Sequence, residues 1–312
     1  MFAHSVVRCR SAAGLALVFA LTGGCSQTGT PDTGDRLIVV ATTTVVGDFV
    51  DNVGGQRVDV HVLVPAGGEP HTFDPSPSDV TRLEGAAIVF RNGLGLDDWL
   101  SDLVTDAGTQ APVVALGEGL EGVEYRSSGT DDAGEGHDAA AVDPHVWLNV
   151  AYAERYVERI ADELAAIDPD HAAAYEADAA AYISQLESLD AYARSTLGAI
   201  PESRRSVVSF HEAFSYFAQA YGLTLVDTVV AAPGQDPSAG EVAALIDEIR
   251  ATGVRAILAE SQFPTDLVER IAEETGATVV GGLFSDSLGD PPIDTYIAGI
   301  RFDVDTIAQA LR

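Results

Sequence analysis

The sequence has no lysine and little positive charge of any kind. Its 17 basic residues are all arginine, and 48 acidic residues outweigh them, so the 312-residue chain has a formal net charge of −31. A surface this acidic repels the phosphate backbone of nucleic acids, which argues against DNA and RNA as partners. It attracts cations, although an acidic excess also serves solubility alone.

Cysteine occurs only twice, as Cys9 and Cys25. Two arginines precede an apolar run at residues 12–21. Its length, about ten residues, is typical of a secretory signal peptide and too short to span a bilayer, and no later segment approaches the ~20 apolar residues of a membrane helix. We therefore expect residues 1–24 to be a signal peptide. Its removal would leave one cysteine, so no internal disulfide is possible and the fold depends on its apolar core.

A cysteine at the cleavage site resembles the signal of bacterial lipoproteins, in which that cysteine carries a lipid anchor. The usual pattern has leucine three residues earlier; here that position is Thr22, and Leu21 lies one further back. We expect lipidation of Cys25 and a flexible tether over residues 25–36, which are rich in Gly, Thr and Pro. We therefore expect an exported protein that the lipid holds on the outer face of the cytoplasmic membrane, or alternatively a protein of the periplasm.

From residue 37, short β-branched runs alternate with segments of helical length. This alternation predicts an α/β fold with largely parallel sheets. Apolar residues at spacings of three and four predict two successive helices, the second from about residue 171 to 197, or about 40 Å long at 1.5 Å per residue. The strand–helix alternation then restarts. We expect two α/β lobes, residues 37–168 and 199–312, joined by one long rigid linking helix at 169–198.

Residues 126–143 interrupt the first lobe. They are rich in Gly, Ser and Asp, without apolar periodicity, and they hold one histidine, His137. We expect a mobile loop there.

Three of the seven histidines share a setting that suits ligand binding. His71 comes shortly after a predicted strand, in the stretch PHTFDPSPSDV, which we expect to be a stiff proline-rich loop. His145 follows the long loop, in VDPHVWLN, and His211 comes directly after a strand, in VVSFHEAF. Asp286, in FSDSLGD, follows another strand. The carboxyl ends of strands carry ligands in α/β sheets. The remaining histidines are not expected to bind a ligand; His61, for example, suits the face of a strand, and His171 suits the solvated first turn of a helix.

Three imidazoles and one carboxylate are good ligands for a borderline divalent cation, above all Zn²⁺, whereas Mg²⁺ and Ca²⁺ require more oxygens. For each histidine alone, a helix cap or a loop hydrogen bond is the better explanation. The stretch HEAFS differs from the metalloprotease motif HExxH because its fifth residue is Ser215, so Glu212 is not expected to be a catalytic base.

Several motifs together resemble the solute-binding lipoproteins of bacterial zinc and manganese ABC importers. In order along the chain they are GGEPHTFDPSPSDV, VFRNGLGLDDWL, DPHVWLN, VVSFHEAFSYFAQAYGL, GQDPSAGEVAALIDEIRATGVRAILAESQF and FSDSLGD. The resemblance covers nearly the whole chain from about residue 37.

This resemblance implies that metal is held in the cleft between the lobes, by His71, His145, His211 and Asp286. Manganese members typically have glutamate at the third position, so histidine there favours zinc, with Mn²⁺ as the alternative. Glu69 would stand behind the ligands as an additional acid. The partners implied are an ABC permease and its ATPase, with the chain itself a monomer.

Two other classes of function remain open on the sequence alone. A zinc hydrolase needs an open coordination position and a nearby general base. Four protein ligands would close the site, and no motif supplies the base, so we do not expect an enzyme. Surface lipoproteins of this type can also act as adhesins, and nothing in the sequence tests that role.

Overall fold

The computed structural model describes residues 36–127 and 142–312. The expected signal peptide, the lipidation site Cys25, nearly all of the tether and residues 128–141 of the expected mobile loop lie outside the described residues. Ser127 and Val142, at the two ends of that segment, form an isolated antiparallel bridge. Among the described helices, none is long and apolar enough to cross a bilayer.

The first sheet is parallel and has the strand order β2-β1-β3-β4. Its strands are β1 (Leu37–Ala41), β2 (Val58–Val62), β3 (Ile88–Arg91) and β4 (Val113–Ala115). Helices cover both faces, which explains why β1 and β3 are continuous apolar runs rather than alternating ones. This lobe also contains α1 (Thr44–Gly54), η1 (Gly55–Arg57), α2 (Pro77–Glu84) and α3 (Leu100–Ala107).

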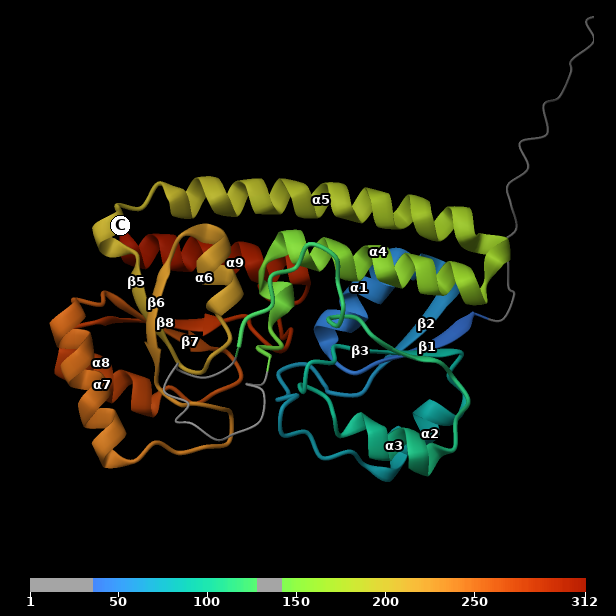
Figure 1. The fold of residues 1–312 in the computed structure, drawn as a ribbon, viewed down its shortest axis with the longest axis horizontal. Helices are drawn as coiled ribbons and strands as arrows, with labels where there is room; N and C mark the ends of the chain where they lie inside the picture. Colours follow the sequence, from blue (N-terminus) through green and yellow to red (C-terminus); the bar gives the residue numbers. More distant parts are fainter. Residues whose placement is uncertain (1–35, 128–141) are drawn as a thin grey trace, which may run out of the picture. The chain divides into compact units, whose positions relative to one another are not determined.

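The second sheet repeats this arrangement, with the strand order β6-β5-β7-β8. Its strands are β5 (Ser206–Ser209), β6 (Thr224–Thr228), β7 (Ala256–Glu260) and β8 (Thr278–Leu283), and all are parallel. Helices α7 (Ala239–Thr252) and α8 (Asp266–Thr275) pack on one face, while α6 (Ser215–Tyr221) and α9 (Tyr296–Leu311) lie toward the linking helix (Figure 1).

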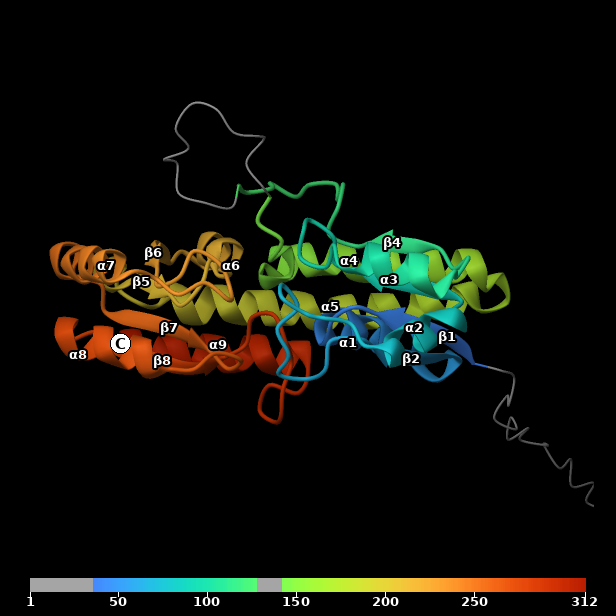
Figure 2. The same ribbon diagram turned by 90° about the horizontal axis from the view of Figure 1, so that it is seen from below.

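Two long helices connect the sheets. After η2 (Val146–Leu148), α4 spans Val150–Ile167; η3 (Pro169–His171) turns the chain into α5 (Ala172–Gly198), and η4 (Glu202–Arg204) leads to β5. Helix α5 lies along α4 in its first part and along α9 in its second (Figures 1 and 2). The apolar positions predicted for it are all buried: Tyr175, Ala179, Tyr182, Leu186, Leu189, Ala193 and Leu197. The prediction of two parallel α/β lobes with one long joining helix is confirmed.

One local feature differs from the sequence expectation. Only the first part of the stretch at residues 70–80 is a loop, because α2 begins at Pro77. Ser76 caps this helix, and Asp79 at its third position accepts the Ser76 backbone N–H over 2.8 Å. Proline is well tolerated in the first helical turn, where its missing N–H has no partner in any case. The capping box therefore fixes the far end of the His71 loop.

Candidate metal centre

His71 lies in the loop between β2 and α2, and two contacts hold this loop in place. Glu69 Oε1 accepts the backbone N–H of His71 over 2.8 Å. The indole N–H of Trp99 donates to the carbonyl oxygen of Pro70 over 3.0 Å. The side chain of His71 is only partly buried.

His145 is buried, and contacts hold both its backbone and its ring. Asp143 Oδ1 accepts the backbone N–H of His145 over 3.0 Å and also lies 2.7 Å from its Nδ1. Since a carboxylate only accepts, Nδ1 must carry the hydrogen and Nε2 faces the other way. Asn92 Nδ2 donates to the carbonyl oxygen of Pro144 over 3.1 Å, which anchors the approach to the histidine.

His211 follows β5, and its partner comes from the neighbouring strand. Glu260 is the last residue of β7, which pairs with β5, and its Oε1 lies 3.0 Å from Nδ1 of His211. The sheet order changes direction between β5 and β7, which is the position where open α/β sheets bind ligands. Asp286 follows β8, and Gln262 Nε2 donates to its Oδ2 over 3.0 Å.

The four side chains converge on one point. Nε2 of His145 lies 3.2 Å from Nε2 of His71, 3.4 Å from Nε2 of His211 and 3.1 Å from Asp286 Oδ1. Nε2 of His211 lies 3.2 Å from Asp286 Oδ2, and all four potential ligand atoms lie within 4.8 Å of one another. A tetrahedral zinc site with bonds of about 2.0 Å has edges of about 3.3 Å. The structure therefore brings together the four residues singled out from the sequence, at ligand spacing.

Burial and charge oppose each other in this cluster. Burial alone would lower the pKa of His145, but the Asp286 charge and the hydrogen bonds with Asp143 and Asp286 raise it to about 9. The pKa of His211 is likewise raised well above its usual value, despite burial, by Asp286 and Glu260. Burial works against the Asp286 carboxylate, yet His211 and His145 hold its pKa well below the usual range. A cation at the centre would take the place of the protons on these imidazoles.

His71 has the opposite tendency. Burial lowers its pKa to about 3, despite the nearby Asp286 charge. Its imidazole is neutral at pH 7 and available to a metal without losing a proton.

Around the imidazoles, several buried carboxylate oxygens have no hydrogen-bond partner within the described part of the chain. They include Glu69 Oε2, Asp143 Oδ2, Glu260 Oε2 and Asp286 Oδ1. Burial, followed by the charge of Asp286, raises the pKa of Glu69 to about 7. Unsatisfied buried carboxylates are costly unless a positive charge compensates them. Their gathering around three imidazoles fits a divalent cation.

The three histidines also line a cavity of about 1140 Å³, whose wall continues along β6 and α7. Acidic residues of this wall include Asp227, Asp236 and Glu248. The cavity therefore reaches the cluster at its three histidines.

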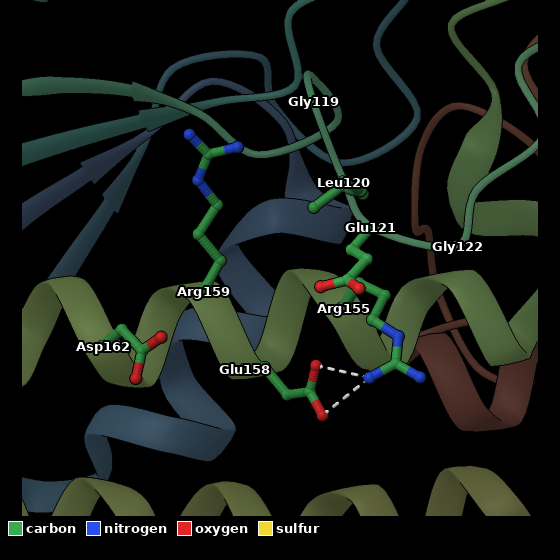
Figure 3. A pocket seen from close by; sticks show the side chains of 8 residues that line it. All are labelled: Gly119, Leu120, Glu121, Gly122, Arg155, Glu158, Arg159 and Asp162. Carbon is green, nitrogen blue, oxygen red and sulfur yellow. Dashed lines mark hydrogen bonds and ion pairs between the residues drawn. The ribbon is translucent and has the colours of Figure 1, made fainter.

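A second hollow, of about 620 Å³, lies between α4 and the turn at residues 119–122 (Figure 3). Its two arginines have hydrogen-bond partners within the chain. Arg155 Nη1 lies 2.8 Å from Glu158 Oε2, and Arg159 Nη1 donates to the carbonyl oxygen of Glu118 over 2.6 Å. Because its cations already have partners, we do not regard this hollow as a candidate site.

The histidines that were not expected to bind metal are not part of the four-residue cluster. His61 is on β2, with Nε2 3.8 Å from Asp59, and Nδ1 of His171 lies 2.8 Å from Asp168 Oδ2 at the start of α5. His137 lies outside the described residues.

Sequence reasoning missed Asp143, Glu260 and Gln262. Asp143 had a local signal, because an acid two residues before a histidine can bond both its backbone and its ring. Glu260 and Gln262 become neighbours of the site only through the pairing of β7 with β5. Their positions at a strand end are the one signal that could have found them.

Comparisons with known proteins agree over nearly the whole chain. The family described as "Zinc-uptake complex component A periplasmic" matches residues 39–310. The manganese-binding lipoprotein MntA of Halalkalibacterium halodurans is 31% identical over 290 residues, which cover 92% of this chain and 93% of the relative. The iron ABC transporter substrate-binding lipoprotein MtsA of Streptococcus pyogenes serotype M1 is 30% identical over 303 residues, with coverage of 94% and 95%.

Solved structures are similar over the same region. The periplasmic zinc binding protein TroA from Treponema pallidum superposes with a TM-score of 0.78 at 28% identity, covering 89% of this chain and 99% of that one. A manganese-bound periplasmic metal binding protein from Candidatus Liberibacter asiaticus has a TM-score of 0.78, with coverage of 89% and 100%. At 24% identity, the second structure supports the fold alone.

Proposed function

Because this chain belongs to the family of the zinc-uptake complex component A, periplasmic, we propose that it captures one Zn²⁺ ion outside the cytoplasm and delivers it to an ABC importer. The family consists of extracytoplasmic metal-binding proteins of transporters and not of enzymes. We therefore set the hydrolase alternative aside. The metal is cargo here, held and released without chemical change.

The observation that carries the proposal is the convergence of His71, His145, His211 and Asp286. Four separations between their ligand atoms are 3.1 to 3.4 Å and match the edges of a zinc tetrahedron, which are about 3.3 Å. Three of the four side chains are buried and His71 is partly exposed. We propose these four as the ligands.

The surrounding carboxylates support a doubly charged ion. Glu69, Asp143, Glu260 and Asp286 bring up to four negative charges to one buried region, and His145 and His211 can offset two of them by holding protons. A divalent cation offsets the same two charges with one particle and frees both imidazoles for coordination. We propose that Glu69, which bonds the backbone of His71 and not its ring, acts through loop position and charge.

Manganese is the second candidate cargo, and similarity to the manganese-binding MntA favours it. Three imidazoles favour zinc, because nitrogen ligands suit borderline cations better than harder ones. Geometry and metal supply also select the ion in cells, so the choice needs a direct competition.

The partners follow from the same family. We propose a permease with its ATPase as the receiver of the ion, membrane attachment through a lipid on Cys25, and a monomeric binding protein. The lipoprotein names of both sequence relatives support the anchor.

The test is a calorimetric titration of the metal-stripped protein with Zn²⁺ and Mn²⁺, followed by competition between them. We expect one saturable zinc site, a higher melting temperature with zinc because the ion binds only the folded site, and displacement of Mn²⁺ by equimolar Zn²⁺. His61→Ala is the matched control, since His61 lies outside the cluster. Two outcomes contradict the proposal. One is a wild-type chain that binds no zinc, and the other is weak binding of several zinc ions that is unchanged in a His71→Ala variant.

A further inference from the structure

Asp286 belongs to the C-terminal lobe in sequence, but the segment around it is bonded to the N-terminal lobe. In this Asp286 segment (residues 285–288), the carbonyl oxygen of Ser285 accepts the indole N–H of Trp147 over 2.9 Å. The backbone N–H of Leu288 donates to Thr44 Oγ1, at the start of α1, over 2.7 Å. The carbonyl oxygen of Leu288 accepts the N–H of Gly67 over 2.9 Å.

These N-terminal partners lie beside the other two ligands of their lobe. Trp147 is two residues after His145, and its carbonyl oxygen accepts the hydroxyl of Tyr296 over 2.6 Å. Gly67 is in the loop that leads to His71 and has a φ of 71°, a conformation that strains any residue with a Cβ. The Asp286 segment is therefore bonded to the two pieces of chain that carry His71 and His145.

The chain changes partners immediately before this segment. At the end of β8, the carbonyl oxygen of Leu283 accepts the N–H of Ser261 over 2.8 Å, within the C-terminal lobe. The N–H of Phe284 still donates to Asp303 of α9 over 2.9 Å. From Ser285 on, the backbone is bonded to the N-terminal lobe, while Gln262 holds the side chains of Ser285 and Asp286 from the C-terminal side.

His211 has a different environment. Its ring is held by Glu260 of β7, and Ser209 Oγ donates to its carbonyl oxygen over 2.6 Å. Both partners belong to the second sheet.

We propose that Thr44 and Trp147 are positioning residues, which hold Asp286 on the N-terminal lobe so that it forms one unit with His71 and His145. His211 is then the ligand that the C-terminal lobe brings to a three-ligand half-site. If the lobes separate, the chain bends between Phe284 and Ser285. This inference rests on the metal-binding function proposed above.

The first test removes the hydroxyl of Thr44 without changing the shape of the side chain. Thr44→Val leaves the buried N–H of Leu288 without its acceptor, so we expect zinc dissociation about tenfold faster and affinity about tenfold lower. Thr44→Ser keeps the oxygen and should bind zinc as wild type does. Trp147→Phe, which removes the indole N–H, is a second variant with the same expected direction.

A double-mutant cycle separates positioning from general damage. If Thr44 acts through Asp286, Thr44→Val should change affinity less than about twofold in an Asp286→Ala background, because interacting sites are not additive. In a His211→Ala background the loss of about tenfold should remain. Circular dichroism and the melting temperature of the metal-free variants monitor folding.

Equal effects of Thr44→Val in the wild-type and Asp286→Ala backgrounds would overturn the inference, since the threonine would then act on stability and not through Asp286. A zinc affinity of Thr44→Ser as low as that of Thr44→Val would also overturn it. These outcomes differ from failure of the proposed function, in which the wild-type chain itself binds no zinc.

Discussion

Oε1 of Glu260 lies 3.0 Å from Nδ1 of His211, and both residues are about 1% exposed. Asp143 stands in the same relation to His145, at 2.7 Å. Each carboxylate accepts the hydrogen of Nδ1, so Nε2 is the nitrogen that faces the other ligands and gives up its proton when a metal binds, and each carboxylate makes that nitrogen a stronger base. Two of the three histidines are therefore set before any ion arrives.

We expect Glu260→Gln and Asp143→Asn each to lower zinc affinity by about 10- to 100-fold, the usual effect of losing such a partner. The amide keeps the size of the side chain and its ability to accept a hydrogen bond, but it lacks the charge that strengthens the imidazole. Chelator competition measures the loss.

Asp303→Asn is the matched control for these two variants. Asp303 is also fully buried and accepts the N–H of Phe284, but burial raises its pKa well above the usual value. Its carboxyl group bonds the backbone of Phe284 and not an imidazole, and the amide can accept the same hydrogen bond, so the change should alter zinc affinity less than about twofold. Wild-type affinity in Glu260→Gln would mean that the carboxylate does not tune His211.

We expect His211→Ala to cost more zinc affinity than Asp286→Ala. Without Asp286, a water molecule can complete the tetrahedron around three imidazoles, whereas without His211 only two imidazoles and one carboxylate remain. We expect a loss of at least ~100-fold for His211→Ala and about tenfold for Asp286→Ala, measured by chelator competition. The reverse order would make the carboxylate the principal ligand and would favour manganese as the cargo.

Much of the fold could be predicted because its elements have strong local signals. The linking helix is the clearest case, since seven apolar residues at spacings of three and four are the seven that are buried on α5. The two sheets were equally predictable, because strands that are covered on both faces appear in the sequence as short apolar runs. The start of α2 at Pro77 was missed, since a proline-rich stretch resembles a loop until its capping box is recognised.

The candidate site was only partly predictable. The positions of four residues after stiff or strand-ending segments singled them out, namely His71, His145, His211 and Asp286, and the family resemblance implied that all four are metal ligands. The bonds of residues 285–288 to Thr44, Gly67 and Trp147 join segments more than 130 residues apart in sequence. Such contacts depend on the packing of the two lobes, for which no local pattern exists.

We expect deletion of about residues 127–140 to leave zinc affinity within about threefold of wild type. This segment contains one histidine, His137, and one side chain cannot form a second metal site. The backbone N–H of Asp143 donates to the carbonyl oxygen of Arg126 over 2.8 Å, so the chain on the two sides of the deletion is close together and a short Gly-Ser connection can replace the deleted residues. A large loss of affinity would show that the segment takes part in binding.

We expect zinc binding at pH 7 to release between about one and two protons per ion. The raised pKa values of His145 and His211 mean that both rings are positively charged in the metal-free protein at this pH, with a second proton on Nε2. Affinity should therefore increase as the pH rises from 6 toward 9. Calorimetry in buffers of different ionisation enthalpy counts the protons, and His211→Ala should release about one fewer. Release of no protons would show that the imidazoles are neutral before binding.

The stability of the fold should also depend on Asp48, a residue of α1. Its Oδ2 accepts the hydroxyl of Tyr182 on α5 over 3.0 Å and the N–H of Tyr296 on α9 over 3.3 Å. Burial raises the pKa of Asp48 from 3.8 to about 6, although both hydrogen bonds oppose the shift. The folded state therefore holds a proton there that the unfolded chain loses at lower pH.

A raised folded-state pKa stabilises the protein below pH 4, and this contribution is lost as the pH rises through about 6. Asp48→Asn mimics the protonated form and can accept the same hydrogen bonds. We expect equal stability of variant and wild type at pH 4 and a gain of about 1–3 kcal/mol, or a few degrees in melting temperature, for the variant at pH 8. Thermal unfolding of the metal-free proteins across this range measures the difference, with the exposed Asp162→Asn on α4 as control. A variant that is less stable than wild type at pH 8 would show that the ionised carboxylate strengthens the contacts among α1, α5 and α9 more than its burial weakens them.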